Sequence, residues 1–280
     1  MPDLDWANVV DFTESLTHSV GAELLAQFGH VQAQAKADGS LVTQADQWAD
    51  QTLRAAIQRQ YPEHGLLSEE TSQIFPATPW CWVIDPLDGT TNFAQGIPLW
   101  GISLGLLYQG IPVFGAVYIP PLGDFFHGFW SSAQHLDTLA LPSGAFHNHQ
   151  PITVTTAALS SNHLFSFCTR SIHHLDLPNS GSSPFPCKIR MLGVATYNVL
   201  SIATGAVIGG VEATPKVWDI AATWVITQAA GATWKFLQME AFPLQPMQDY
   251  IQASYPSLVT AQPDLQSAFQ PFLTSLCKFD

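Results

Sequence analysis

An apolar segment that ends in two carboxylates is the feature of this sequence that most restricts how the chain can fold. Residues 82–92 read WVIDPLDGTTN, so Asp85 and Asp88 directly follow a run of hydrophobic residues. A buried carboxylate costs on the order of several kcal/mol unless a cation or hydrogen bonds compensate it. Two acids at the end of a buried strand therefore predict a bound cation, for which hard divalent ions are the natural candidates.

The residues around these acids predict a second kind of ligand at the same place. Pro86 fixes its own φ and lacks an N–H, which favours a sharp bend that lets the two acids and the Leu87 carbonyl converge. Gly89 allows close approach of a ligand, and Thr90 begins a helix start whose N–H groups would face an anion. The alternative is a strand, an Asp-Pro turn and a capped helix. That turn chemistry explains neither the second acid nor the Thr pair, so metal and phosphate are expected at one corner.

Several motifs accompany this run. They are an acidic motif at 36–46 (KADGSLVTQAD), a Glu-Glu motif at 66–70 (LLSEE), and the segments 193–196 (GVAT) and 218–222 (WDIAA) with Glu212 between them. In this order and spacing they resemble the inositol monophosphatase family, whose Mg²⁺-dependent phosphatases also include histidinol-phosphate, phosphoadenosine-phosphate and fructose-bisphosphate phosphatases. The resemblance covers nearly the whole chain. One departure is Ser68, where many relatives have Gly.

The resemblance implies a fold, a cofactor and a set of ligands. The expected fold is α+β, a layered α-β-α-β-α sandwich, and the protein is expected to be a lithium-sensitive homodimer that uses two or three Mg²⁺ ions. One ion would be bound by Glu69, Asp85 and the Leu87 carbonyl. A second would be bound by Asp85, Asp88 and Asp219, and a third, weaker ion would contact Glu69.

It also implies the catalytic groups. Thr90 would bind the attacking water, Asp46 would accept from the Thr90 hydroxyl, and Glu70 would assist from behind the metal ligands. The alternative for Asp46 is a capping role, because Thr43 is a good N-cap three residues earlier. The amides of Gly89 and Thr90 would bind phosphate oxygens.

Substrate choice is expected to rest on the second half of the chain. Gly193 and Ala195 would let the ligand approach the backbone, or would serve only helix packing. Glu212 resembles the residue that accepts hydrogen bonds from the substrate's hydroxyls; the alternative is a solvent-facing acid. Lys216 is expected on the surface, and residues 36–40 are expected to form a loop that closes over the third metal.

Composition restricts the partners and the compartment. The 280 residues, 47% hydrophobic, suffice for a large core. A net charge of −13, from 22 acids against 9 bases, argues against nucleic acid. The apolar stretch 199–211 is too short to span a bilayer, the acidic N-terminus shows no secretory signal, and the cysteines have no ligand spacing. We therefore expect a cytoplasmic protein whose partner is a small phosphorylated substrate, with no membrane contact.

Apolar periodicity predicts the elements and a division into halves. Helices are expected at 4–28, 43–60, 196–204 and 219–230, and strands at 65–68, 80–84, 99–119 (a hairpin turning at 109–110), 124–130, 152–154 and 188–192. Residues 141–150 are rich in Pro, Gly, His and Asn, which favours a boundary there. The prediction is an α+β metal-binding half at 1–145 and an α/β substrate-binding half at 146–280.

The expected reaction is hydrolysis of a small phosphomonoester, with inositol 1-phosphate first among the substrates. Histidinol phosphate, 3′-phosphoadenosine 5′-phosphate and fructose 1,6-bisphosphate are alternatives within the same family. The alternative from another class is a non-catalytic descendant that binds metal and phosphate. Such a binder would need neither Thr90 nor Asp46, so their presence favours the enzyme.

Overall fold

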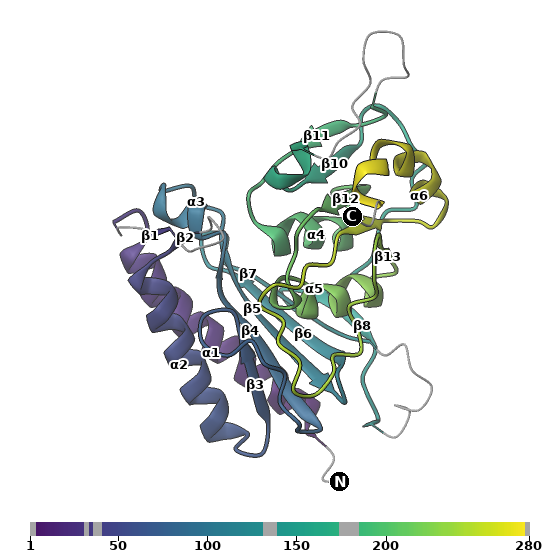
Figure 1. Cartoon of the computed structure of the whole chain (residues 1–280). Helices are drawn as coiled ribbons and strands as arrows, with labels where there is room; N and C mark the ends of the chain where they lie inside the picture. Colours follow the sequence, from purple (N-terminus) through teal and green to yellow (C-terminus); the bar gives the residue numbers. More distant parts are fainter. Residues whose placement is uncertain (1–3, 31–33, 36–40, 131–138, 174–184, 278–280) are drawn as a thin grey trace.

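The computed structural model describes residues 4–30, 34–35, 41–130, 139–173 and 185–277. Two β-sheets alternate with layers of helices (Figure 1). The larger sheet has seven strands in the order β3-β4-β5-β6-β7-β8-β9, and the smaller has five in the order β11-β10-β12-β14-β13. A short β1-β2 pair, Gln34–Ala35 and Leu41–Val42, stands apart from both.

Two long helices cover the outer face of the larger sheet. They are α1 (Trp6–Gln27), which begins where Asp5 accepts from the amides of Ala7 and Asn8, and α2 (Gln44–Gln60). The buried side chains of α2 recur at helical spacing: Ala45, Ala49, Leu53 and Ile57. That apolar face packs on β4, while α1 packs on β6. The helices predicted at 4–28 and 43–60 are confirmed.

The larger sheet is mainly an antiparallel meander. Its strands are β3 (Gly65–Ser68), β4 (Trp80–Asp88), β5 (Gly101–Tyr108), β6 (Ile111–Ile119), β7 (Asp124–Phe129), β8 (Gly144–His147) and β9 (Gln150–Ile152). Only β3 pairs in parallel, with β4. The strands predicted at 65–68 and 124–130 and the hairpin turn at 109–110 are confirmed, although β4 continues past Ile84 to Asp88.

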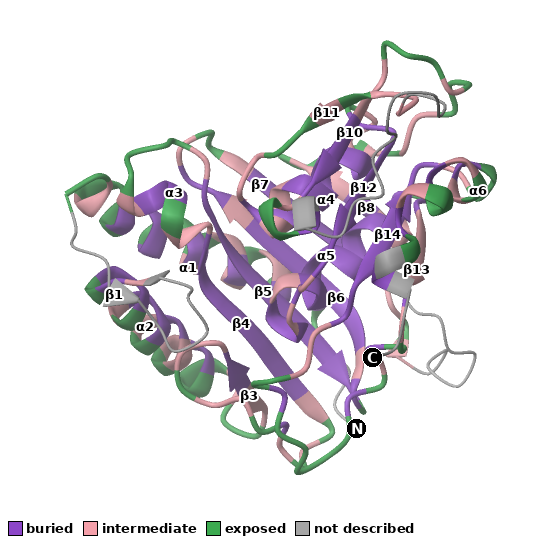
Figure 2. Cartoon of the chain, turned by 45° about the horizontal axis from the view of Figure 1, so that its top comes forward, coloured by how far each residue is buried: buried purple, intermediate pink, exposed green. Residues whose placement is uncertain are grey.

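Two helices lie between the sheets. They are α4 (Ala195–Ala203) and α5 (Val217–Ala229), close to the predicted 196–204 and 219–230. Nearly every residue of α5 is buried, because the helix packs on β5 and β6 on one side and contacts β13 on the other (Figure 2). A helix that is apolar all round needs cover on both sides, which two flanking sheets provide.

The smaller sheet and a last helix complete the sandwich. The strands are β10 (Leu164–Phe167), β11 (Lys188–Arg190), β12 (Gly209–Glu212), β13 (Thr233–Phe236) and β14 (Ser257–Thr260), and α6 (Asp264–Phe269) packs on β14. Short elements are α3 (Thr90–Ala94) and three 3₁₀ turns, Thr169–His173, Gln270–Phe272 and Thr274–Cys277. The predicted α-β-α-β-α layering is confirmed.

The segment 141–150 differs from its prediction as a boundary. It contains β8 and the start of β9, so the larger sheet continues to Ile152, beyond residue 145. Its Asn148 and His149 have positive φ values of 48° and 62° and form the hairpin turn between β8 and β9. The strand predicted at 152–154 is this β9, two residues earlier. The division into two halves remains a prediction.

None of the helices in the described residues is long and apolar enough to cross a membrane. The loop at 36–40, predicted to close over a third metal, lies outside the described residues.

Candidate active site

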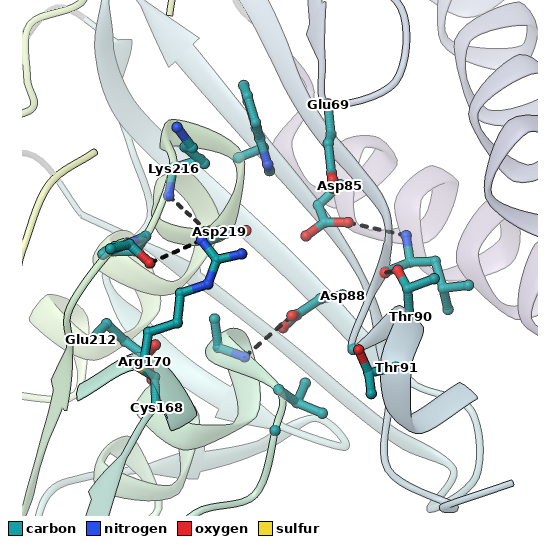
Figure 3. Close-up of a pocket in the computed structure, with 18 of the residues that line it drawn as sticks. Glu69, Asp85, Asp88, Thr90, Thr91, Cys168, Arg170, Glu212, Lys216 and Asp219 are labelled. Atoms are coloured by element: carbon teal, nitrogen blue, oxygen red, sulfur yellow. Dashed lines mark hydrogen bonds between the residues drawn. The ribbon is translucent and has the colours of Figure 1, made fainter. Parts of the chain in front are cut away.

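A cavity of about 730 Å³ opens where β4, α3 and the N-terminal ends of α4 and α5 meet (Figure 3). Eleven of the predicted site residues line it: Glu69, Glu70, Asp85, Leu87, Asp88, Gly89, Thr90, Gly193, Ala195, Glu212 and Asp219. Asp46 is not in the lining; it lies behind Thr90. The tertiary structure thus brings all the predicted residues together around one space, although they come from segments up to 173 residues apart in the sequence (219 − 46).

An irregularity in β4 turns its two acids toward this cavity. Residues three apart in a regular strand point to opposite faces. Here the pairing with β5 shifts register, because Asp85 lies opposite Ser103 whereas Asp88 lies opposite Gly101. Pro86 sits inside this bulge, where the missing N–H breaks no ladder bond. The bulge therefore does what the Asp-Pro bend was predicted to do.

The acids of the cavity repel one another. Burial, followed by the charges of Glu69, Asp88 and Asp219, raises the pKa of Asp85 well above its ordinary value. Burial, with Asp88 and Glu69 next, does the same for the pKa of Asp219, partly opposed by Lys216. Figure 3 shows Glu69 and Asp85 on one wall and Asp219 across the cavity from them. Several buried carboxylates with raised pKa values are the electrostatic signature of a place for cations.

The donor atoms fit hydrated Mg²⁺. They are carboxylate and carbonyl oxygens, which hard ions prefer, and Mg²⁺ keeps several waters and needs only one or two carboxylates besides substrate oxygens. Among the described residues, no three His, Cys, Asp or Glu side chains are grouped closely enough to hold an ion by themselves. Asp85, Asp88 and Asp219 are thus not drawn together as a three-carboxylate cage, and water and phosphate oxygens would have to complete each coordination sphere.

Thr90 joins the cavity to the first helical layer. Its hydroxyl lies 3.0 Å from Asp46 Oδ1 and 3.0 Å from the Leu87 carbonyl oxygen, so it can donate to either acceptor. The other oxygen of Asp46 accepts from the amide and hydroxyl of Thr43, at 2.7 and 2.6 Å. Both interpretations of Asp46 are therefore confirmed as contacts: one oxygen caps α2 and the other reaches Thr90.

Asp88 is held by the start of α4. Its carboxylate accepts from the Ala195 amide at 3.2 Å, the Thr196 amide at 2.7 Å and the Thr196 hydroxyl at 2.6 Å. The residue before α4, Val194, provides no side-chain cap, so an acid 108 residues away in sequence caps this helix instead. These bonds lower the pKa of Asp88 against the raising effect of burial, which remains the largest influence.

We expect Thr196→Val to destabilise the fold through this contact. The variant keeps the shape but removes one of the hydrogen bonds to a buried carboxylate, a loss of about 1.5–3 kcal/mol in the free energy of unfolding. Thr196→Ser, which retains the hydroxyl, is the matched control. Urea denaturation of the three proteins would measure the difference, and equal midpoints for Val and wild type would show that the amides alone hold Asp88.

Two glycines are required where the start of α3 meets the segment before α4. Gly89 and Gly193 have positive φ values of 89° and 76°. A Cβ on Gly89 would lie 2.8 Å from Val194 Cγ2, and one on Gly193 would lie 2.9 Å from Asn92 Oδ1. Gly193 therefore serves local packing as well as lining the cavity, which was the alternative interpretation of this residue.

Glu212 is buried at the end of β12 and is not a solvent-facing acid. Asn198 Nδ2 donates to its Oε1 at 2.8 Å, and the Cys168 thiol adjoins it. Burial is the main cause of the raised pKa of Glu212, and Asp88 and Asp219 add to it. The alternative of a surface carboxylate is thus wrong.

Lys216 lies in the cavity wall, not on the open surface as expected. Its Nζ donates to the Ile251 carbonyl at 2.9 Å, and its backbone amide donates to Asp219 Oδ2 at 2.7 Å. The side chain therefore belongs to the border of the site, next to a predicted metal ligand.

The sequence interpretation missed further residues at the site. Asp50, one turn after Asp46, is buried and accepts from the Ser68 and Thr71 hydroxyls, on either side of Glu69 and Glu70. The i, i+4 spacing of the two acids on α2 could have indicated it. Ser68 therefore has a partner of its own in Asp50. Arg170 and Asn198, which also line the cavity, lie in no motif that would have signalled them.

Comparisons with known proteins agree with this geometry. Residues 5–267 match the model of the inositol monophosphatase family. An inositol-1-monophosphatase of Synechocystis is 37% identical over 225 residues, which cover 76% of this chain and 73% of the relative. The chain belongs to the inositol monophosphatase family.

Other relatives in the family carry different names. A histidinol-phosphatase of Chlorobaculum parvum is 29% identical over 224 residues, covering 77% of this chain and 81% of the relative. A solved IMPase structure of Thermotoga maritima superposes with a TM-score of 0.77 at 24% identity, covering 96% of this chain and 98% of that one. The predicted family, fold and enzyme class, a phosphatase, are confirmed.

Proposed function

We propose that this protein is a Mg²⁺-dependent phosphomonoesterase that converts inositol 1-phosphate, or a closely similar polyol phosphate, to the alcohol and inorganic phosphate. The observation that carries the proposal is the Thr90–Asp46 contact at the edge of a buried acidic cavity. A protein that only bound metal and phosphate would have no use for a hydroxyl oriented by a second carboxylate.

Glu69, Asp85, the Leu87 carbonyl, Asp88 and Asp219 are the residues that would hold two or three Mg²⁺ ions. The bound ions would lower the pKa of a water, neutralise phosphate charge and stabilise the leaving oxygen. Glu70, beside Glu69 in the same wall, would orient these groups from behind them.

Thr90 and Asp46 would orient the attacking water. When the Thr90 hydroxyl donates to Asp46 Oδ1, its lone pairs are left to accept a proton of the water and to aim the water's oxygen at phosphorus. No Ser belongs to the described cavity lining, and its one thiol, Cys168, adjoins Glu212 but has a pKa raised to about 11 by burial and by the Glu212 charge, so the thiolate is disfavoured. Direct attack by water is therefore favoured over a covalent intermediate.

Phosphate and alcohol would bind on different sides of the cavity. The amides of Gly89 and Thr90 would bind phosphate oxygens, and Gly193 and Ala195, which also line the cavity, would leave room beside them. Glu212, on the wall of the smaller sheet, would accept hydrogen bonds from hydroxyls of the alcohol. A polyol satisfies this acid, and so does the amino-alcohol of histidinol phosphate.

A substrate panel tests the proposal. Phosphate release would be measured with inositol 1-phosphate, histidinol phosphate, 3′-phosphoadenosine 5′-phosphate and fructose 1,6-bisphosphate. The proposal expects the highest kcat/KM for inositol 1-phosphate. A clear preference for another ester would show that inositol 1-phosphate is not the preferred substrate. No phosphate release from any of the four esters would contradict the proposal that the protein is a phosphomonoesterase.

The proposed metal site predicts an effect of Mg²⁺ on stability as well as on activity. A chelator should abolish turnover while the far-UV circular dichroism spectrum remains that of a folded protein, because the acids line a preformed cavity. Added Mg²⁺ should raise Tm, since a ligand at 100 times its Kd stabilises by about 2.7 kcal/mol. Turnover that persists in chelator, or a Tm indifferent to Mg²⁺, would contradict the metal site. The family resemblance adds that Li⁺ should inhibit.

Glu212→Gln tests the alcohol side. The variant should lower kcat/KM for inositol 1-phosphate by about tenfold or more and change turnover of glycerol 2-phosphate much less, because the smaller alcohol makes fewer contacts. Steady-state kinetics on both esters would measure the ratio. Equal losses of kcat/KM on both esters would show that Glu212 supports the metal site or the fold. No loss on either ester would show that Glu212 does not bind the alcohol.

The proposal includes a homodimer in the cytoplasm. Support for a reducing compartment comes from Cys81, Cys168 and Cys187, which are free thiols. Light scattering coupled to size-exclusion chromatography would test the dimer, which requires twice the chain mass of 30.5 kDa.

A further inference from the structure

One buried amide in the cavity wall belongs to none of the motifs. Asn198, on the first turn and a half of α4, is 1% exposed and lines the cavity. Its Nδ2 donates to Glu212 Oε1 at 2.8 Å, across from α4 to the end of β12. The contact is short and well within the range of a strong amide–carboxylate hydrogen bond.

This amide is only half satisfied. Asn198 Oδ1 is buried and has no hydrogen-bond partner among the described residues. Leaving such an acceptor unpaired costs about 1–3 kcal/mol, whereas a leucine of similar size in its place would carry no such cost. The neighbouring α4 residues Val199, Leu200 and Ile202 are apolar and buried, so an apolar side chain would suit this helix. The donor to Glu212 is the one feature of Asn198 that an apolar residue could not supply.

The backbone of Asn198 is held in place, which fixes where its side-chain amide begins. The backbone N–H of Asn198 donates to the Val194 carbonyl at 3.0 Å, and the backbone carbonyl of Asn198 accepts from the Ser166 hydroxyl of β10 at 3.2 Å. Ser201 adds a third contact, from its hydroxyl to the same carbonyl at 2.7 Å. Asn198 is thus tied to α4 and to the smaller sheet, and the side chain leaves a rigid base.

The same helix holds the other half of the site. The Ala195 and Thr196 amides bind Asp88 within the same turn of α4 from which Asn198 binds Glu212. An α-helix rises 1.5 Å per residue and is stiff over so short a length. The start of α4 therefore sets the position of the alcohol-side carboxylate relative to the metal-side carboxylate.

We propose that Asn198 is a positioning residue that selects the orientation of Glu212 and keeps its carboxylate aimed at a hydroxyl of the substrate's alcohol. The proposal rests on the proposed function, in which Glu212 binds that alcohol. It assigns alcohol specificity to a pair, Asn198 and Glu212, and separates this pair from the phosphoryl chemistry at Thr90. A loss at Asn198 should then reduce discrimination between alcohols more than turnover of a simple ester.

Four proteins and two esters test the pair. Asn198→Leu, Glu212→Gln, the double variant and wild type would be assayed with inositol 1-phosphate and glycerol 2-phosphate, in Mg²⁺ and well below each Tm. Asn198→Leu should lower the ratio of the two kcat/KM values by about tenfold, mainly through KM for inositol 1-phosphate. In the Glu212→Gln background the same substitution should change the ratio less than twofold, because the partner is already altered. Asn198→Ala provides a second test if the leucine does not fold.

Thr227→Val is the matched control. Thr227 is fully buried in α5, does not line the cavity, and its hydroxyl bonds only to carbonyls of its own helix, at 2.7 and 3.2 Å. This variant should lower Tm without changing the ester ratio. The proposal would be overturned if Asn198→Leu left the ratio of the two kcat/KM values unchanged. It would also be overturned if the fold-changes of Asn198→Leu and Glu212→Gln in that ratio multiplied in the double variant. If Glu212→Gln itself leaves the ratio unchanged, the assignment of Glu212 fails and the pair fails with it.

Discussion

Asp85→Asn should abolish catalysis and at the same time stabilise the metal-free protein. Asp85 would be a ligand of two of the proposed ions, so loss of its charge would weaken both, and kcat should fall by about 10³-fold or more. In the metal-free fold the same carboxylate is buried against Glu69, Asp88 and Asp219, all of which raise its pKa. Asparagine keeps the shape and can still accept from the Leu87 amide, which donates to Asp85 Oδ1 at 3.0 Å. Neutralising the residue therefore removes repulsion without removing a hydrogen bond.

The stability change has a definite pH dependence. An acid whose pKa is raised on folding holds more protons in the native state than in the unfolded chain. The metal-free wild type should then lose stability as pH rises above the ordinary value of 3.8, while Asp85→Asn should lose less. Near neutral pH the variant's Tm without metal should be higher by several degrees, at about 2–4 °C per kcal/mol for a chain of this size.

Two measurements check this result. Calorimetry with and without Mg²⁺ should show a higher Tm for the metal-free variant and a smaller rise with Mg²⁺ than in the wild type. Asp11→Asn, an exposed acid of α1, is the control and should change neither activity nor the response to Mg²⁺. Near-normal kcat in Asp85→Asn would reject Asp85 as a shared ligand, and a lower Tm without metal would show that the acids do not repel as the geometry indicates.

Thr90→Ala is expected to give the second largest loss. Without the hydroxyl no group connects the attacking water to Asp46, so kcat should fall by about 10²-fold or more, with a smaller change in KM. The fold should be little affected, because Asp46 keeps its contacts to Thr43 and continues to cap α2. Single-turnover and steady-state kinetics would separate the two parameters.

Thr90→Ser separates the hydroxyl from the rest of the side chain. It retains the donor to Asp46 Oδ1 and should recover most of the kcat that alanine loses. A change confined to KM in Thr90→Ala would instead assign Thr90 to phosphate binding. Equal loss in both variants would show that the methyl group, and hence packing, is what the site requires.

Local sequence determined the elements and the chemical nature of the site. The apolar spacing of α1 and α2 and the alternation of the β5-β6 hairpin specify helix and strand without help from distant residues. The two acids and the Pro in the last residues of β4, followed by Gly89, signal a charged ligand, because nothing else in a buried strand could neutralise two carboxylates. These patterns involve residues close together in the sequence, so they can be recognised without knowledge of the tertiary structure.

Only the tertiary structure decided how those residues serve one another. Sequence leaves Asp46 either as a cap or as a partner of Thr90, and the fold makes it both, because its two oxygens face different elements. From the sequence, Lys216 and Glu212 could each lie on the surface, and both line the cavity because α5 begins there and β12 ends there. Asn198 and Asp50 carry no motif; their partners are brought to them by sheet pairing and helix packing. Contacts between segments tens of residues apart depend on the layering of the whole chain, and no local pattern encodes it.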